Sequence, residues 1–121
     1  MIVEDDLSLQ RLYEMMLNAF GFEVSSIASN GKEAIEIYQS LPKKPDVILM
    51  DHRMPVKNGI DATLEILKNG SNTKVIFTSA DNSIKKKALE IGATSFIAKP
   101  FNIQQLHEEI KRVTSLEKAS I

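Results

Sequence analysis

Short apolar runs recur along this chain and alternate with longer segments whose apolar positions are three or four residues apart. A short continuous apolar run is typical of a strand buried on both faces, whereas the wider spacing is typical of an amphipathic helix. The pattern predicts strands at residues 1–3, 22–27, 46–50, 74–79 and 95–98. The first strand starts abruptly, as expected if residues that precede it are missing.

Helical spacing fills the segments between these strands. The third helix is predicted to follow Asn58-Gly59 and to end at Asn69-Gly70. A capping residue with glutamate or glutamine three positions later predicts the start of the second helix at Asn30 and of the fifth at Asn102. The residues predicted to face the core from the first and third helices are Leu9, Leu12, Met16 and Phe20, and Ile60, Leu64 and Leu67, respectively.

Five strands alternating with five helices predict an α/β fold in which right-handed crossovers make the sheet parallel. For five strands the flavodoxin-like order 2-1-3-4-5 is favoured, which gives a three-layer sandwich. We expect one domain at residues 1–114, followed by a polar tail or the start of a linker at residues 115–121.

Composition narrows the class of protein. The 121 residues are 43% hydrophobic and 26% charged, as in ordinary globular domains, and the net charge of −1 gives no reason to expect nucleic-acid or membrane binding. The absence of cysteine excludes disulfides, thiolate catalysis and cysteine-ligated zinc. No apolar run approaches a bilayer span and no signal peptide is visible, so we expect a cytoplasmic location.

Reactive side chains stand at the carboxyl ends of four predicted strands, where open α/β sheets place their sites. They are Glu4 and Asp5 after the first strand, Asp51 after the third, Ser79 at the end of the fourth and Lys99 after the fifth. Taken alone, Asp51 is more simply explained as a turn residue or helix cap. In the expected strand order, however, the acids lie side by side, where their mutual repulsion favours a bound cation such as Mg²⁺.

A hydroxyl and an ammonium group beside one carboxylate suit phosphoryl transfer. Asp51 could act as a nucleophile that forms an acyl phosphate. Lys99 and the cation would neutralise charge on the phosphoryl oxygens, and Ser79 would hydrogen-bond one of them.

Four short motifs occur together, namely Glu4-Asp5-Asp6, Asp51…Met54-Pro55…Gly59, Ser79-Ala80 and Lys99-Pro100-Phe101. Through these motifs the chain resembles the receiver domains of two-component response regulators, and the resemblance covers essentially all of residues 1–114. The resemblance implies that Asp51 accepts phosphate from a histidine kinase. It also implies that Asp5 binds Mg²⁺ directly, that Glu4 binds it through water, and that the backbone carbonyl of Arg53 completes the metal ligands.

The resemblance further implies a switch formed by Ser79, whose hydroxyl moves onto the phosphate, and Phe96, whose ring turns inward behind it. Because Phe96 has no hydroxyl, we expect inward packing to be favoured even without phosphate. Arg53 and Asp81 match positions that tune dephosphorylation, and we hypothesise that they pair across the site and screen the acyl phosphate from water. Lys99-Pro100 resembles the family's cis peptide bond.

Three neighbouring residues are expected to play other parts. The family's spacing to Gly21 aligns Asp5 rather than Asp6 with the metal ligand, which leaves Asp6 at the helix N-terminus. His52 directly follows Asp51 on a strand, so its side chain should point to the opposite face. His107 is expected on the surface of the last helix.

As a receiver, the chain would be a signalling domain that catalyses its own phosphorylation and dephosphorylation. Its expected partners are a sensor histidine kinase or phosphotransfer protein and a downstream protein or fused output domain. A homodimer could form through the fourth helix, fifth strand and fifth helix. The chain would act either as a stand-alone regulator or as part of a longer protein.

Three alternatives remain open at this stage. A receiver that mediates contacts without accepting phosphate would not need the full set of acids, Ser79 and Lys99. A phosphatase of the haloacid-dehalogenase type would need a second acid two residues after Asp51, where Arg53 stands. A flavin-binding module would need a phosphate-cradling loop after the first strand, where Glu4-Asp5-Asp6 has the wrong charge.

Overall fold

A computed structural model describes residues 1–68 and 70–115. Within that part of the chain, a parallel sheet has the order β2-β1-β3-β4-β5, which confirms the predicted topology. The strands are β1 (Ile2–Val3), β2 (Ile27–Ala28), β3 (Val47–Asp51), β4 (Lys74–Ser79) and β5 (Ser95–Ala98). The predicted end of the third helix at Asn69 and the predicted tail beyond residue 115 lie outside the described residues.

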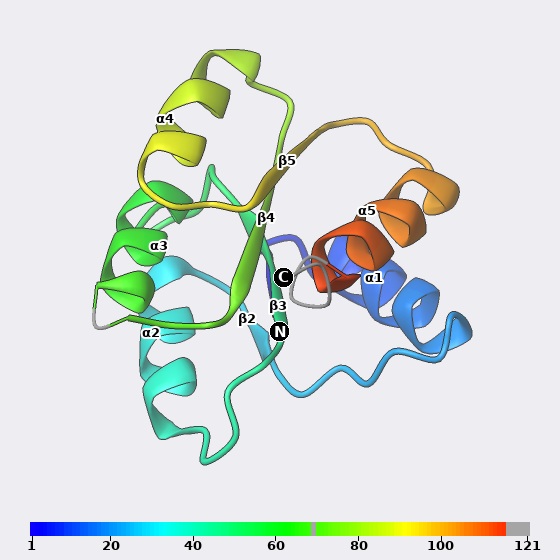
Figure 1. Ribbon diagram of the computed structural model, residues 1–121, viewed down its shortest axis with the longest axis horizontal. Coiled ribbons are helices and arrows are strands. Elements are labelled where there is room, and N and C mark those ends of the chain that lie inside the picture. Colours follow the sequence, from blue (N-terminus) through cyan, green and yellow to red (C-terminus); the bar gives the residue numbers. More distant parts are fainter. Residues whose placement is uncertain (69, 116–121) are drawn as a thin grey trace.

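Helices cover both faces of the sheet (Figure 1). One face carries α1 (Leu7–Ala19) and α5 (Ile103–Ser115), and the other carries α2 (Gly31–Ser40), α3 (Gly59–Leu67) and α4 (Lys85–Glu90), which a short 3₁₀ turn, η1 (Asn82–Ile84), precedes. Each face has its own apolar core. Ile2, Leu49 and Ile76 face α1 and α5, whereas Val3, Met50 and Phe77 face the other layer.

The second strand is much shorter than predicted. Residues 22–26 form no strand, and only Ile27 and Ala28 pair with Ile2 and Val3. Because β2 is an edge strand beside a two-residue β1, it has few backbone partners available. The alternating apolar residues Phe22 and Val24 pack against the α1/α5 core instead of entering the sheet.

The inward faces of α1 and α3 also differ from the prediction. The buried residues of α1 are Gln10, Tyr13 and Leu17, while Leu12 is 48% exposed. On α3, Leu64 is 45% exposed, and the buried residues are instead Gly59, Ala62, Thr63 and Ile66. Hydrophobic spacing alone predicts that these two leucines are buried, whereas the helices bury small and polar residues in their place.

The predicted caps form, with one difference. Asn30 Oδ1 accepts a hydrogen bond from the Glu33 backbone N–H at 2.8 Å, but the Glu33 carboxylate accepts from Ser29 rather than from Asn30. At α5, Asn102 and Gln105 exchange side-chain-to-backbone hydrogen bonds of 2.8 and 2.9 Å. In residues 1–68 and 70–115, no helix is both long and apolar enough to cross a bilayer.

Candidate functional site

Three carboxylates meet at the carboxyl edge of the sheet. Val3 pairs with Met50, so the next residues on the two strands, Glu4 and Asp51, lie beside each other. Oxygen atoms of Glu4, Asp5 and Asp51 all lie within 4.8 Å of one another. Glu4 and Asp51 are buried and Asp5 is exposed, so the cluster has one open side.

Lys99 joins the two buried acids. Its Nζ atom lies 3.1 Å from Glu4 Oε1 and 3.2 Å from Asp51 Oδ1. Burial on its own would lower the pKa of Lys99, but the charge of Asp51 and the hydrogen bond and charge of Glu4 help to raise the pKa above its ordinary value. The amine is therefore an ammonium group at neutral pH and a fixed positive charge beside Asp51.

Burial raises the pKa of both Asp51 and Glu4, because desolvation disfavours their charged forms. At Asp51 the Lys99 charge opposes this effect, whereas the nearby Asp5 adds to it. At Glu4 the backbone N–H of Asp6 opposes it with a hydrogen bond to Oε2 of 3.1 Å. The ionised forms of Glu4 and Asp51 are thus destabilised in the folded protein, and the ammonium group of Lys99 offsets only part of this destabilisation.

Four hydrogen bonds hold Glu4 in place. Its backbone N–H donates to Ala28 O at 3.0 Å, and its backbone oxygen accepts from Gln10 Nε2. Its two carboxylate oxygens accept separately from Asp6 and Lys99. This fixed geometry distinguishes Glu4 from its exposed neighbour Asp5.

Asp6 caps α1. Its Oδ1 atom accepts hydrogen bonds from Ser8 N at 2.8 Å and Leu9 N at 3.1 Å. The interpretation of Asp6 as a helix N-terminal residue is therefore consistent with its contacts, and the cluster contains Asp5 instead.

Ser79 is buried at the end of β4, next to β5. Its Oγ atom accepts a 3.0 Å hydrogen bond from the Asp81 backbone N–H, which leaves its own hydrogen available for donation. Phe96 pairs with Phe77 across the two strands and is half-buried against the core under α3 and α4. The role of Phe96 in a switch stays a prediction.

Arg53 and Asp81 form the predicted pair. Arg53 NH2 lies 3.6 Å from Asp81 Oδ2, and the Arg53 side chain is 79% exposed. Hydrogen bonds from the Ser83 hydroxyl and backbone N–H lower the pKa of Asp81, with a smaller contribution from Arg53. The pair joins the loops after β3 and β4, and the Lys99–Pro100 bond in the loop after β5 is cis, as expected.

The predicted orientation of His52 agrees with the structure, whereas the predicted surface position of His107 does not. His52 packs near Phe77, on the side of the sheet away from α1, and its Nδ1 atom is buried with no hydrogen-bond partner among the described residues. His107 is not a free surface residue, because its ring stacks on Phe20 at 3.8 Å and meets Phe22 edge-on. It fills the space between the end of α1 and α5.

Two residues near the cluster were not singled out from the sequence. Gln10 is buried and binds the Glu4 backbone, while Tyr13 is buried and stacks on Phe101, two residues after Lys99. Tyr13 and Gln10 are three positions apart on α1, so they share its inner face. In the sequence, their involvement could have been inferred only from a glutamine and a tyrosine at helical spacing with apolar residues such as Leu17.

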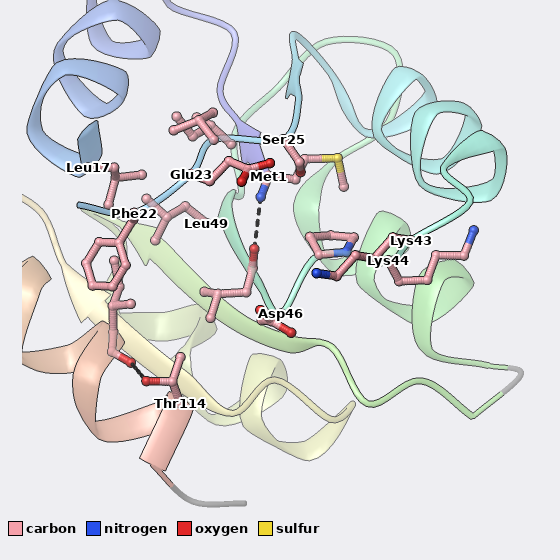
Figure 2. Close-up of a pocket in the computed structure, with 15 residues that line it drawn as sticks. Met1, Leu17, Phe22, Glu23, Ser25, Lys43, Lys44, Asp46, Leu49 and Thr114 are labelled. Atoms are coloured by element: carbon pink, nitrogen blue, oxygen red, sulfur yellow. Dashed lines mark hydrogen bonds between the residues drawn. The ribbon is translucent and has the colours of Figure 1, made fainter. Parts of the chain in front are cut away.

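A pocket of about 230 Å³ lies at the opposite, amino end of the sheet (Figure 2). Leu17, Phe22 and Leu49 line it, and the Met1 amine donates a 2.9 Å hydrogen bond to Val47 O at its edge. None of the three clustered carboxylates lines this pocket. The candidate site is therefore the acid cluster and not this cavity.

The model of the response regulator receiver domain matches residues 1–111. This chain belongs to that family. As a receiver domain, it is a signalling domain of the two-component response regulator type, and its sheet order and helical layers are those that its solved relatives share.

Among curated relatives, the receiver is 38% identical to the chemotaxis protein CheY of Thermotoga maritima over 116 residues, which are 94% of this chain and 95% of that protein. Among solved structures, a chain of the CheX-CheY-BeF3-Mg²⁺ complex from Borrelia burgdorferi matches with a TM-score of 0.88 and 27% identity, covering 93% of this receiver and 86% of that chain. The receiver domain of the sensor histidine kinase PA1611 from Pseudomonas aeruginosa, with a magnesium ion in its active site cleft, matches with a TM-score of 0.80 and 30% identity, covering 92% of each chain.

Proposed function

We propose that this receiver accepts a phosphoryl group on Asp51 in a reaction that depends on Mg²⁺. The proposal rests on the position of Lys99, whose Nζ atom lies 3.2 Å from Asp51 Oδ1 and 3.1 Å from Glu4 Oε1. The exposed Asp5 lies in the same cluster of carboxylates. A fixed ammonium next to a carboxylate nucleophile neutralises the charge that phosphoryl oxygens bring to the site.

The donor set fits a magnesium ion. All three clustered side chains offer carboxylate oxygens, the hard ligands that Mg²⁺ prefers, and their repulsion is only partly relieved by Lys99. We assign Asp5 and Asp51 as direct ligands, Glu4 as a ligand through water because both its oxygens are already bonded, and the Arg53 backbone carbonyl as the remaining protein ligand. When bound, the ion would hold phosphoryl oxygens against these groups and neutralise part of their charge.

In the proposed step, an Asp51 carboxylate oxygen forms a bond to the phosphorus of a phosphohistidine. The P–N bond breaks, its electron pair stays on the imidazole, and that ring takes up a proton from solvent. Lys99 stays protonated throughout and stabilises the charge on the transferred group. Hydrolysis of the acyl phosphate by water then releases inorganic phosphate and restores the Asp51 carboxylate.

Phosphorylation is proposed to change partner binding through Ser79 and Phe96. The Ser79 hydroxyl can donate its hydrogen to a phosphoryl oxygen while it still accepts from the Asp81 N–H. Because Phe96 is only half-buried, the ring can pack further inward and so shift a two-state equilibrium. The Arg53–Asp81 pair would slow the approach of water to the acyl phosphate.

The proposed partners are a sensor histidine kinase or phosphotransfer protein, as phosphodonor, and a downstream protein or fused output domain. The matched structures include CheY in a complex with CheX, which supports a protein partner, and the receiver domain of the sensor histidine kinase PA1611, which supports a link to histidine kinases. A homodimer through α4, β5 and α5 is a further proposal. Three exposed lysines on α4, namely Lys85, Lys86 and Lys87, lie on that face.

The test is phosphorylation with acetyl phosphate, with and without Mg²⁺, read by intact mass. The wild-type protein is expected to gain one phosphoryl group only with the metal, and Asp51→Asn is expected to gain none. Asp6→Asn is the matched control, since asparagine preserves the helix cap next to the cluster. Modification that persists in Asp51→Asn, or turnover of an unrelated phosphoester, would contradict the proposal and favour a different reaction.

A further inference from the structure

Helix α1 places one buried polar side chain beneath the acid cluster. Gln10 is 8% exposed, and its Nε2 atom donates to the Glu4 backbone oxygen at 2.5 Å and to Ser29 Oγ at 3.1 Å. A buried amide is costly unless its hydrogen bonds are made, and these two bonds direct it to the ends of β1 and β2. Gln10 has no part in the phosphoryl-transfer step proposed above.

The Glu4 backbone oxygen belongs to the peptide unit that leads into Asp5. Because a peptide bond is planar, a hydrogen bond that fixes its oxygen also fixes the direction of the following N–H and Cα. Asp5 is exposed, so packing restrains it less than it restrains Glu4. The hydrogen bond from Gln10 therefore restrains Asp5 through its backbone.

We propose that Gln10 is a positioning residue that sets the affinity of the acid cluster for a divalent cation. It holds the Glu4–Asp5 peptide so that the Asp5 carboxylate stands next to Asp51 before the cation binds. Without this bond, Asp5 would become ordered only when the cation binds. The entropy lost in that ordering would weaken cation binding. The inference rests on the proposed cation site and adds a determinant of its affinity.

A purely structural role makes a different prediction. If Gln10 only links the ends of β1 and β2 by hydrogen bonds, its loss should lower the stability of the fold without a specific effect on the affinity for the cation. Ser29→Ala separates the two bonds of the Gln10 amide, because it removes the contact with Ser29 and leaves the donor to Glu4 in place. Tyr38→Phe removes buried hydrogen bonds to Ser71 and Thr73 at the other end of the sheet and serves as a stability control.

The experiment is a titration with Mg²⁺ alone, followed by the backbone amide NMR signals of Asp5 and Asp51, with Tm measured for each variant. In Gln10→Met, which keeps an unbranched side chain without donors, we expect the Mg²⁺ dissociation constant to rise about tenfold, as for other residues that orient metal ligands. Ser29→Ala and Tyr38→Phe are expected to keep the wild-type constant, whatever their loss in Tm.

A dissociation constant for Gln10→Met within about twofold of wild type would overturn the inference, as would an equal rise in Tyr38→Phe. If Gln10→Met does not fold, the wild-type protein still gives a test. The Gln10 side-chain amide protons should be protected from exchange with solvent before Mg²⁺ is added, and rapid exchange would overturn the inference. Wild-type protein that binds no Mg²⁺ would instead refute the cation site itself, which is a distinguishable result.

Discussion

Gly59 lies so close to Asp51 that a Cβ atom at this position would collide with the Asp51 carbonyl oxygen and lie 3.0 Å from His52 Cα. The Gly59 backbone N–H also donates a 3.0 Å hydrogen bond to His52 O. The start of α3 is therefore built directly against the backbone that carries the proposed phosphoacceptor.

Gly59→Ala is expected to push α3 away from the end of β3 and to displace Asp51. Overpacking against a backbone atom should cost about 1–3 kcal/mol of stability and slow phosphorylation by acetyl phosphate. The control is Gly21→Ala, where φ is +84° but nothing lies within 4 Å of the added atom. It should lose about 1–2 kcal/mol through backbone strain and keep its phosphorylation rate. Wild-type kinetics in Gly59→Ala would contradict this account.

Asp51→Asn should raise the Tm of the metal-free protein by several degrees at neutral pH. Burial raises the pKa of Asp51 in the folded state, so the ionised carboxylate costs folding free energy above that pKa. As pH falls through the folded pKa, the wild-type carboxylate becomes protonated and the advantage of asparagine should shrink. Melting curves at several pH values in the presence of a chelator test this. A lower Tm for Asp51→Asn at neutral pH would be the opposite result.

Addition of Mg²⁺ should stabilise the wild-type protein, because a ligand that binds only the folded state shifts the unfolding equilibrium. At ten times the dissociation constant the gain is about 1.4 kcal/mol. Asp5→Asn removes one clustered carboxylate and should lose most of this gain, whereas Asp61→Asn, which changes an acid on α3 outside the cluster, should keep it. Equal stabilisation of both variants would place the cation elsewhere.

Arg53→Ala should shorten the half-life of the phosphorylated protein if the Arg53–Asp81 pair screens the acyl phosphate. The pair is exposed, so its loss should leave Tm almost unchanged and act on hydrolysis alone. Decay of the phosphorylated form can be followed by intact mass. Lys68→Ala, which breaks another exposed ion pair with Glu65, is the control. An unchanged half-life in Arg53→Ala would refute the screening role.

Glu109 should give the protein an acid-sensitive contribution to stability. Burial alone would raise its pKa, but hydrogen bonds from Arg112 and from the buried Ser95 outweigh this and lower it. Because the folded pKa is depressed, the stabilisation is present above the unfolded value and is lost as pH falls through the folded pKa. Glu109→Gln should therefore lower Tm near neutrality, and the difference should vanish in acid. Glu108→Gln on the same helix serves as the comparison, and a difference that is independent of pH would rule out this origin.

Much of the site could be predicted because it lies at strand ends. The carboxyl ends of parallel strands share one edge, so the order of the strands brings Asp51 beside Glu4 and Asp5, and Lys99 to the same edge. These positions follow from where each apolar run stops. The pairing of Arg53 with Asp81 was predictable for the same reason, since both residues follow neighbouring strands.

The supporting contacts could not be predicted in this way. Hydrophobic spacing selected Leu12 for the inner face of α1, yet that face buries Gln10, which bonds the Glu4 backbone, and Tyr13, which stacks on Phe101. His107 was assigned to the surface because its neighbours on α5 are acidic, although it stacks on Phe20. Each of these outcomes depends on which residues another helix brings into contact.

The sequence by itself thus determined the alternation of strands and helices, the helix caps, and the acids, hydroxyl and amine at the strand ends. These features depend on local periodicity and on residues adjacent in the chain. Only the tertiary structure decided how far β2 extends, which face of α1 is buried, and that a glutamine on α1 holds the backbone before Asp5. Such contacts join residues far apart in the chain, and their energies depend on packing that no local pattern encodes.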